Sequence, residues 1–270
     1  MSRALALALA GGVLVIAWIL GRSLLSAHRR NRLRRRSLTD AERRTLADWL
    51  PAIGRMPPEL RDRLERLTAV FIGERQFVGC GGLTIVSEMK LAIAAQACLL
   101  VLGRDTHVYD ELRAVLVYPS QFVVPEQSQD EHGIVTDEER VLAGEAWDQG
   151  RIILSWEDVG ARGADGEAFN VVIHEFAHYL DHESGGAPWI VDAAARRHWQ
   201  GLLDAELARL RDAERRGEPT LLDPYAAEDR AEFFAVASET YFEEPRRFAR
   251  AMPVLYAALR DVYRLDPAAW

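Results

Sequence analysis

The stretch Asn170-Val-Val-Ile-His174-Glu175-Phe-Ala-His178-Tyr-Leu-Asp-His182 contains an H-E-x-x-H motif. Residues four apart on an α-helix share one face, so two imidazoles at this spacing can both bind one zinc ion. Glu175 follows the first histidine and can act as general base on a water that zinc activates. The alternative is an amphipathic helix with two solvated histidines. The apolar residues before the motif favour the metal site, because a buried His-Glu-His cluster without metal is costly to desolvate.

A hydrolytic zinc site needs a third protein ligand and an open fourth position. His182 is unsuitable, because about 12 Å of helix axis separate it from His174. The longer pattern H-E-x-x-H-x-x-G-x-x-H also fails, since Asp181 and Ser184 stand at its glycine and final histidine positions. We expect His182 to lie near the helix end or to orient another group. Asp181 either orients a histidine or is a surface acid.

A downstream segment, Asp223 to Phe242, offers the missing acid. It reads as a mostly buried helix with Asp223 and Pro224 as start signals. Glu232 and Glu239 both stand next to its apolar stripe. A carboxylate on a buried helix is normally paired or bound to metal. Glu232 is therefore either a salt-bridged structural acid or a zinc ligand.

These segments resemble the Mlc titration factor A (MtfA) family of zinc metallopeptidases, which is similar to the catalytic domain of anthrax lethal factor. The resemblance rests on His174-Glu-Phe-Ala-His178, Tyr225 and Ala231-Glu-Phe-Phe-Ala235, and covers roughly Leu60 to Tyr263. It implies that Glu232 is the third ligand and that Tyr225 assists catalysis. It also implies an α+β, zincin-like fold, mostly helical, with a small sheet beside the active-site helix.

Composition is ordinary for a globular protein, with 49% hydrophobic and 27% charged residues in 270. Residues 1–36 hold eight of the 33 basic residues and no acid, so the remainder carries 25 basic against 41 acidic residues. An acidic body argues against nucleic-acid binding. The two cysteines, Cys80 and Cys98, are too few for a disulfide scaffold and suit buried free thiols, although one bridge is the alternative.

The pattern of the N-terminal residues predicts a membrane anchor. Ala4 to Leu20 is an uncharged run just long enough to span a bilayer. The basic block His28 to Arg36 follows it, and the positive-inside rule places that block in the cytoplasm, against anionic lipid headgroups. We expect a single-pass protein of the bacterial inner membrane, with residues 1–36 as anchor and 37–270 as a metallopeptidase domain facing the cytoplasm. A cleaved signal peptide is the rival interpretation.

Periodicity and breaker residues predict the remaining elements. Helices are expected at about 39–49, 58–72, 88–102, 191–213 and 246–263, the last broken near Pro253. Strands are expected near 77–80, 113–118 and 122–124, with a loop around 130–133. The β-prone run Arg151 to Asp158 is either an edge strand that holds substrate backbone or an ordinary core strand. Gly185 and Gly186 end the motif helix.

The resulting hypothesis is peptide hydrolysis with one Zn²⁺ per chain, bound by His174, His178 and Glu232. Glu175 is the general base, and Tyr225 donates a hydrogen bond to the developing oxyanion. About 10 Å of helix axis would separate Tyr225 from Glu232 in a continuous helix, so we expect an extended segment at Tyr225 and regular helix later. The substrate is then a peptide or protein. The alternative, implied by the resemblance, is a membrane-tethered binding module that sequesters a regulatory protein such as a transcriptional repressor.

Overall fold

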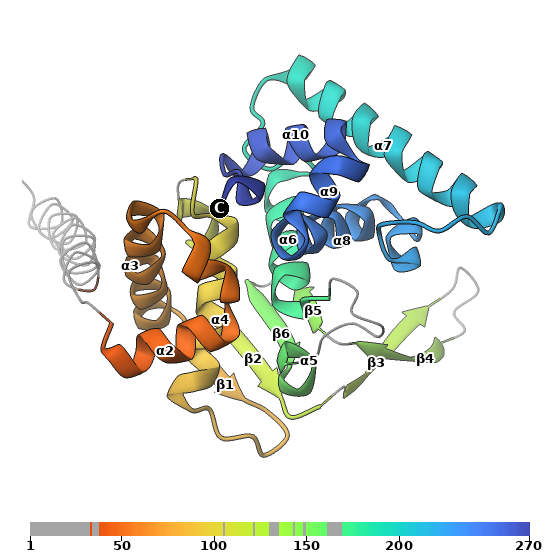
Figure 1. The fold of residues 1–270 in the computed structure, drawn as a ribbon. Coiled ribbons are helices and arrows are strands. Elements are labelled where there is room, and N and C mark those ends of the chain that lie inside the picture. Colours follow the sequence, from red (N-terminus) through yellow and green to blue (C-terminus); the bar gives the residue numbers. More distant parts are fainter. Residues whose placement is uncertain are drawn as a thin grey trace, which may run out of the picture.

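The computed structural model describes Leu33 and residues 38–104, 106–120, 122–129, 135–142, 144–147, 150–160 and 169–270. Figure 1 shows helices gathered around a small sheet, as expected from the sequence. The α-helices are α2 (Asp40–Trp49), α3 (Pro58–Glu74), α4 (Ser87–Leu100), α5 (Trp156–Gly160), α6 (Val171–Ser184), α7 (Ala193–Arg215), α8 (Arg230–Glu243), α9 (Pro245–Ala251) and α10 (Pro253–Tyr263). The strands are β1 (Gln76–Gly79), β2 (Ala114–Tyr118), β3 (Phe122–Gln129), β4 (Val135–Leu142), β5 (Gly144–Trp147) and β6 (Arg151–Ser155). Short 3-10 helices are η1 (Pro51–Arg55), η2 (Thr106–Tyr109), η4 (Pro224–Ala227) and η5 (Pro267–Ala269).

The main sheet has the strand order β1-β2-β6-β5, in which the first three strands are parallel and β5 is antiparallel to β6. Its register places Val115 beside Ile152 and Val117 beside Leu154. All four side chains are fully buried. Because alternate residues of a strand share one face, this row forms the apolar face on which helices pack. The motif helix α6 contacts both β5 and β6.

The run from Arg151 is a central strand, so the predicted role as a substrate-holding edge strand is wrong. β6 is hydrogen-bonded to β2 on one side and to β5 on the other, which leaves no free backbone edge. Periodicity identified a buried strand correctly, but periodicity carries no information about the neighbours of a strand. The strand also ends at Ser155, and α5 begins at Trp156. In the described part of the sheet, the outer position beside α6 belongs to β5.

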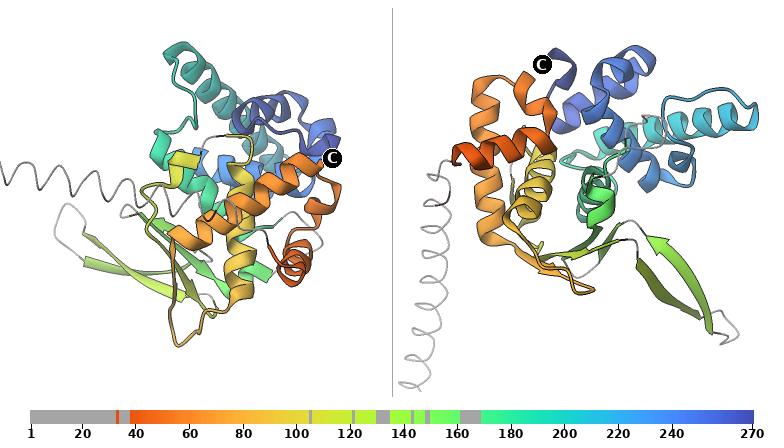
Figure 2. Two further views of the ribbon diagram at one scale, coloured as in Figure 1. Left: turned by 90° about the vertical axis from the view of Figure 1, so that its left-hand side faces the viewer. Right: turned by 60° about the horizontal axis from the view of Figure 1, so that its bottom comes forward.

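A two-stranded antiparallel ribbon, β3 with β4, connects β2 to β5. Its register runs from Phe122 opposite Leu142 to Gln129 opposite Val135. Figures 1 and 2 show this ribbon projecting away from the helices. The sequence predicted only the beginning of β3. The loop expected around 130–133 lies outside the described residues, and β4 was not predicted.

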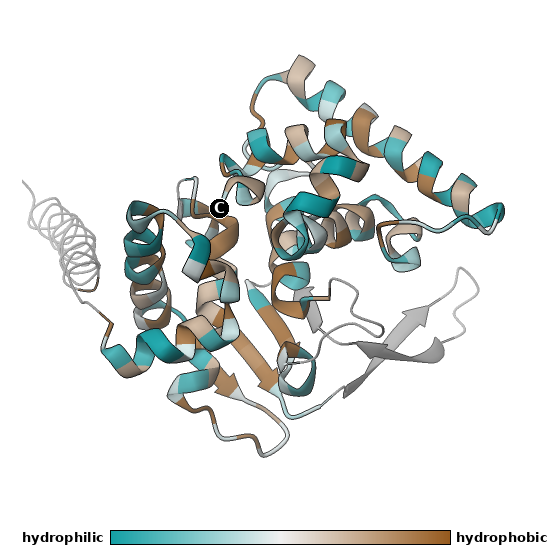
Figure 3. Cartoon of the chain, viewed as in Figure 1, coloured by the Kyte–Doolittle hydropathy of each residue, from teal (hydrophilic) through white to brown (hydrophobic). Residues whose placement is uncertain are grey.

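The first described helix of the N-terminal half begins where its local signal places it. Thr39 and Glu42 form the predicted capping box at the start of α2. α4 is buried along almost its whole length and lies between α3 and α6. Figure 3 shows the corresponding pattern, with hydrophobic residues concentrated on α4 and the central strands and hydrophilic residues on the outer helices. α4 therefore forms the layer between the N-terminal helices and the motif helix.

An aromatic cluster joins the three C-terminal helices. Tyr241 of α8 stacks on Tyr263 of α10 with ring centroids 5.6 Å apart, and Phe242 contacts the same ring at 5.1 Å. Phe248 of α9 adds a contact to Tyr241. The predicted break near Pro253 is confirmed, because α9 ends at Ala251 and α10 begins at Pro253. This packing fixes α8 against α9 and α10.

Cys80 and Cys98 are both free thiols. Cys98 is buried in α4, where burial raises the pKa of its thiol well above the ordinary range. No helix among the described residues is long and apolar enough to cross a membrane. The predicted span Ala4 to Leu20 lies outside the described residues, so the anchor stays a prediction.

Candidate metal centre

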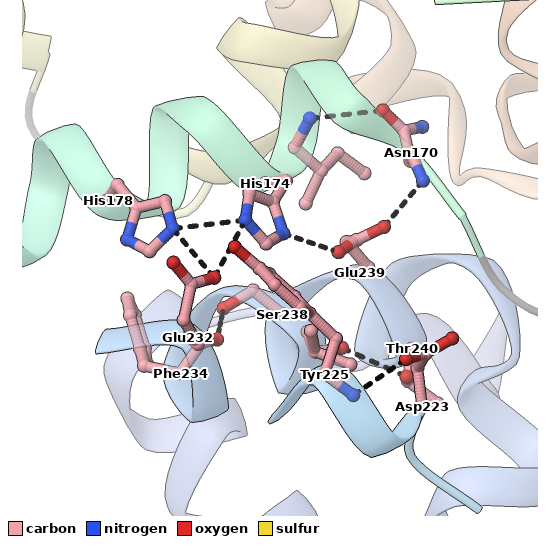
Figure 4. Close-up of polar contacts among 12 residues, drawn as sticks. Asn170, His174, His178, Asp223, Tyr225, Glu232, Phe234, Ser238, Glu239 and Thr240 are labelled. Atoms are coloured by element: carbon pink, nitrogen blue, oxygen red, sulfur yellow. Dashed lines mark hydrogen bonds and ion pairs between the residues drawn. The ribbon is translucent and has the colours of Figure 1, made fainter. Parts of the chain in front are cut away.

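The motif helix α6 has defined ends. The side chain of Asn170 caps its N-terminus, where Oδ1 accepts a hydrogen bond from the backbone N–H of Ile173 at 3.0 Å. Gly185 caps its C-terminus in the left-handed conformation, with φ of 63°, as the glycine signal predicted. His174 and His178 lie one turn apart on the face that meets α8 (Figure 4). The caps thus define the ends of the helix, and the four-residue spacing puts both imidazoles on one face of it.

Glu232 reaches this face from the first turn of α8. Asp229 caps α8, because its side chain accepts hydrogen bonds from the backbone N–H groups of Ala231 and Glu232. The helix therefore begins at Arg230, seven residues after Asp223, and Glu232 is held in a regular turn. Figure 4 shows its carboxylate pointing at both imidazoles.

The three side chains form a compact triangle. The Nε2 atoms of His174 and His178 are 3.0 Å apart, and Oε2 of Glu232 lies 3.1 Å from the first and 3.2 Å from the second. Ligand atoms around a tetrahedral zinc ion with bonds of about 2.0–2.1 Å are about 3.3–3.4 Å apart. The side chains are mostly buried, with 12–18% exposure, so one side of the triangle still meets solvent. Among the described residues, these are the three His, Cys, Asp or Glu side chains grouped closely enough to hold a metal.

The charges in this triangle are strongly coupled. Burial lowers the pKa of His174, but hydrogen bonds to Glu232 and Glu239 outweigh it and raise the pKa to about 10. Burial raises the pKa of Glu232, but hydrogen bonds from both histidines outweigh it and hold the pKa far below its ordinary range. The raised pKa keeps the imidazole of His174 protonated at neutral pH, between the carboxylates of Glu232 and Glu239. A divalent cation would displace that proton.

Glu239 is a site residue that the sequence did not assign. Its Oε1 lies 2.7 Å from Nδ1 of His174, and its Oε2 accepts a hydrogen bond of 2.5 Å from the backbone N–H of Asn170. The sequence placed Glu239 next to the same apolar stripe as Glu232, and this was the available signal. The orienting role was instead considered for Asp181. Asp181 is half-buried, and burial raises its pKa, whereas the carboxylate at hydrogen-bond distance from Nδ1 of His174 belongs to Glu239.

Tyr225 lies beside the triangle, but the extended segment predicted for it is wrong. It sits in the 3-10 helix η4, because Asp223 caps that turn by accepting a hydrogen bond from the backbone N–H of Tyr225 at 2.8 Å, and Pro224 supplies the restricted φ. The later start of regular helix was predicted correctly. The Tyr225 ring lies 6.0 Å from the His174 ring and is 43% exposed. Its side chain is therefore both near the triangle and partly in contact with solvent.

The two remaining residues of the motif segment differ in environment. Glu175 is 5% exposed, and its charge contributes to the raised pKa of His174. His182 is exposed on the last turn of α6 and lies 3.9 Å from Glu183. His182 stands outside the triangle, as its distance along the helix predicted.

Comparison with known proteins agrees with this arrangement. An uncharacterized protein of Synechocystis sp. is 35% identical over 260 residues, which cover 94% of each chain. Mlc titration factor A of Serratia proteamaculans is 34% identical over 235 residues, covering 83% of this chain and 89% of its own. The protein of the same name from Klebsiella pneumoniae strain 342 is 33% identical over 224 residues, covering 81% and 84%. The resemblance noted in the sequence is confirmed. Residues 25–264 match the family described as Glucose-regulated metallo-peptidase M90, and the chain belongs to that family of metallopeptidases.

Proposed function

We propose that this protein is a zinc-dependent peptidase whose metal ligands are His174, His178 and Glu232. The triangle of Nε2, Nε2 and Oε2 atoms, 3.0–3.2 Å apart, carries the proposal. Two imidazoles and one carboxylate match the ligand set of hydrolytic zinc sites, which leave a fourth position open. Membership of a metallopeptidase family supports the same reaction class.

The remaining roles follow from the positions of the side chains. Bound zinc would supply Lewis-acid chemistry, lowering the pKa of water toward neutrality and polarising the peptide carbonyl. Glu175, buried next to His174, would take the proton from the attacking water and pass it to the leaving amine. Tyr225, with its exposed ring 6.0 Å from that of His174, would donate its O–H to the developing oxyanion.

Zinc content and peptide cleavage test this function together. The purified full chain is expected to hold one zinc ion, and Glu232→Ala is expected to lose most of its zinc affinity. Glu175→Gln is expected to keep zinc and lose peptide cleavage, because the amide cannot accept the proton. A wild-type chain that bound no zinc when zinc was supplied would end the proposal. Full peptide cleavage by Glu175→Gln would refute the role of Glu175 as general base, but it would leave the zinc ligands unaffected.

The names of the relatives favour a second candidate, capture of a regulatory protein. Two relatives are called Mlc titration factor A, which associates those proteins with Mlc. A binding function has no need of a general base. Glu175→Gln should therefore bind an Mlc-type repressor as tightly as wild type does. Absence of any binding by either protein would remove this candidate.

We also propose that Ala4 to Leu20 anchors the chain in the inner membrane with residues 37–270 in the cytoplasm. The uncharged run and the basic block from His28 to Arg36 support this placement. The full chain should stay in the membrane fraction after an alkaline wash, and Val15→Arg should release it. Release of the wild-type chain would contradict the proposal.

A further inference from the structure

Three glutamates on one face of α8 contact α6 and its N-terminal cap at successive positions along the two helices. Glu232, Glu239 and Glu243 are separated by seven and then four residues, a spacing that keeps all three on the same side of a helix. Glu232 meets His174 and His178, Glu239 meets His174 and Asn170, and Glu243 meets Asn170. Residue numbers rise along α8 as they fall along α6, so the two helices run antiparallel across the site.

Glu239 uses both oxygens at once and is 2% exposed. Oε1 is 2.7 Å from Nδ1 of His174, and Oε2 accepts the backbone N–H of Asn170 at 2.5 Å. A carboxylate can accept from two donors with two separate oxygens, whereas an amide has one acceptor oxygen and presents N–H groups on its other side. The site is therefore built for a carboxylate at position 239.

An imidazole that donates its Nδ1–H to a carboxylate keeps its Nε2 lone pair for a metal. Glu239 contacts the Nδ1 side of His174, while Nε2 faces Glu232 and His178. Figure 4 shows the His174 ring held between these two carboxylates. The Asn170 hydrogen bond fixes Glu239 in turn, because that backbone group belongs to the cap of α6.

We infer that Glu239 is a positioning residue for the metal centre, holding His174 as the Nδ1–H tautomer with Nε2 aimed at the metal position. The inference rests on the proposed function, because it concerns the same site. Glu239 acts through His174, since its two carboxylate oxygens contact His174 and the backbone of Asn170. Its removal should therefore weaken metal binding by disordering one ring, with the ligand set itself intact.

Glu243 provides a matched control on the same helix. Its Oε1 accepts a hydrogen bond of 2.7 Å from Nδ2 of Asn170. It therefore supports the start of α6 as Glu239 does, but through the side chain of Asn170, whereas Glu239 is the residue that contacts His174. Glu243→Gln tests the support of the helix start, and Glu239→Gln tests that support together with the orientation of His174.

The experiment measures zinc dissociation constants of the full chain by competition with a chelator. Loss of a group that orients a metal-binding histidine typically weakens metal affinity about 10–100-fold. We expect that loss for Glu239→Gln and a change within about twofold for Glu243→Gln. Glu239→Asp keeps the charge on a shorter side chain and should fall between wild type and Glu239→Gln, so it replaces Glu239→Gln if the latter fails to fold.

A nitrogen-15 NMR spectrum of the zinc-loaded protein gives a second readout. The Nδ1–H proton of His174 should be visible and protected from exchange in wild type and in Glu243→Gln, and lost from the spectrum in Glu239→Gln. Equal zinc affinity of Glu239→Gln and wild type, or equal losses in both glutamine variants, would overturn the positioning role alone. Absence of zinc binding by the wild-type chain would instead overturn the proposed function, and the positioning role with it.

Discussion

The raised pKa of His174 makes the stability of the metal-free protein depend on pH. The ordinary pKa of 6.5 rises to about 10 in the fold, because hydrogen bonds to Glu232 and Glu239 outweigh burial. A group with a folded pKa above its unfolded value stabilises the fold fully below the unfolded pKa. That stabilisation is lost as pH rises through about 10. The free energy of unfolding of the metal-free protein should therefore fall with rising pH above 6.5.

The size of this pH dependence is that expected when the folded chain binds one more proton, on His174, than the unfolded chain. Each pH unit between the two pKa values changes the free energy of unfolding by about 1.4 kcal/mol. From pH 7 to 8.5 the loss should be about 2 kcal/mol, a large part of the 5–15 kcal/mol typical of a folded domain. The pH range ends at 8.5 because the thiol of Cys98 ionises above about this pH in the unfolded chain, whereas burial raises its pKa in the folded chain. Ionisation of Cys98 would add a second pH dependence.

Urea unfolding at pH 7, 7.5, 8 and 8.5 after removal of metal measures this slope. His174→Asn, which cannot titrate, is the control and should show a nearly flat profile. Zinc should cancel the loss, because coordination at Nε2 replaces the proton and tightens as pH rises. A flat wild-type profile, or equal slopes in wild type and His174→Asn, would refute the assignment of this pH dependence to His174.

Four further substitutions test the site and the fold. Tyr225→Phe should lower the rate of peptide cleavage about 10²–10³-fold and leave zinc content unchanged; a zinc-free variant would contradict the oxyanion role. Phe176→Ala should lower the free energy of unfolding by about 3–5 kcal/mol, since the fully buried ring packs 5.5 Å from that of Tyr109; a loss below about 1 kcal/mol in urea unfolding would oppose this packing. Gly185→Ala should cost about 1–2 kcal/mol through backbone strain at φ of 63°, because the added Cβ meets nothing closer than 3.7 Å. Gly201→Ala, inside α7 with open space around it, should instead stabilise by about 0.5–1 kcal/mol; the same sign for both glycines would refute the conformational argument.

The predictable features of this protein are those determined over a few residues. The capping box at Thr39, the glycine end of α6 at Gly185 and the break before Pro253 each depend on neighbours in the chain. The one-turn spacing of His174 and His178 is equally local, and it placed the two imidazoles on one face. The histidine spacing can be read from the sequence because the separation of two residues along a helix determines whether they lie on the same face.

The features that the sequence did not reveal depend on contacts between distant segments. β6 was recognisable as a strand, but its central position is decided by pairing with β2 and β5. Tyr225 is the exception, because the contact that decides its conformation is local: its backbone N–H donates a hydrogen bond to Asp223, and a 3-10 turn replaces the extended segment that we expected. Glu239 was visible as a carboxylate beside an apolar stripe, but its partner lies 65 residues away.

The antiparallel packing of α6 and α8 explains why both kinds of feature meet in one site. Glu232, Glu239 and Glu243 contact α6 or its cap from one face of α8, and Asn170, His174 and His178 follow one another at intervals of four residues. A shift of either helix by one residue would rotate its face by about 100° and separate every pair at once. The caps at Asn170 and Asp229 determine where the two helices begin. These caps therefore set the register of the metal centre as well as the ends of the helices, and the cap at Asn170 is itself held by Glu239 and Glu243.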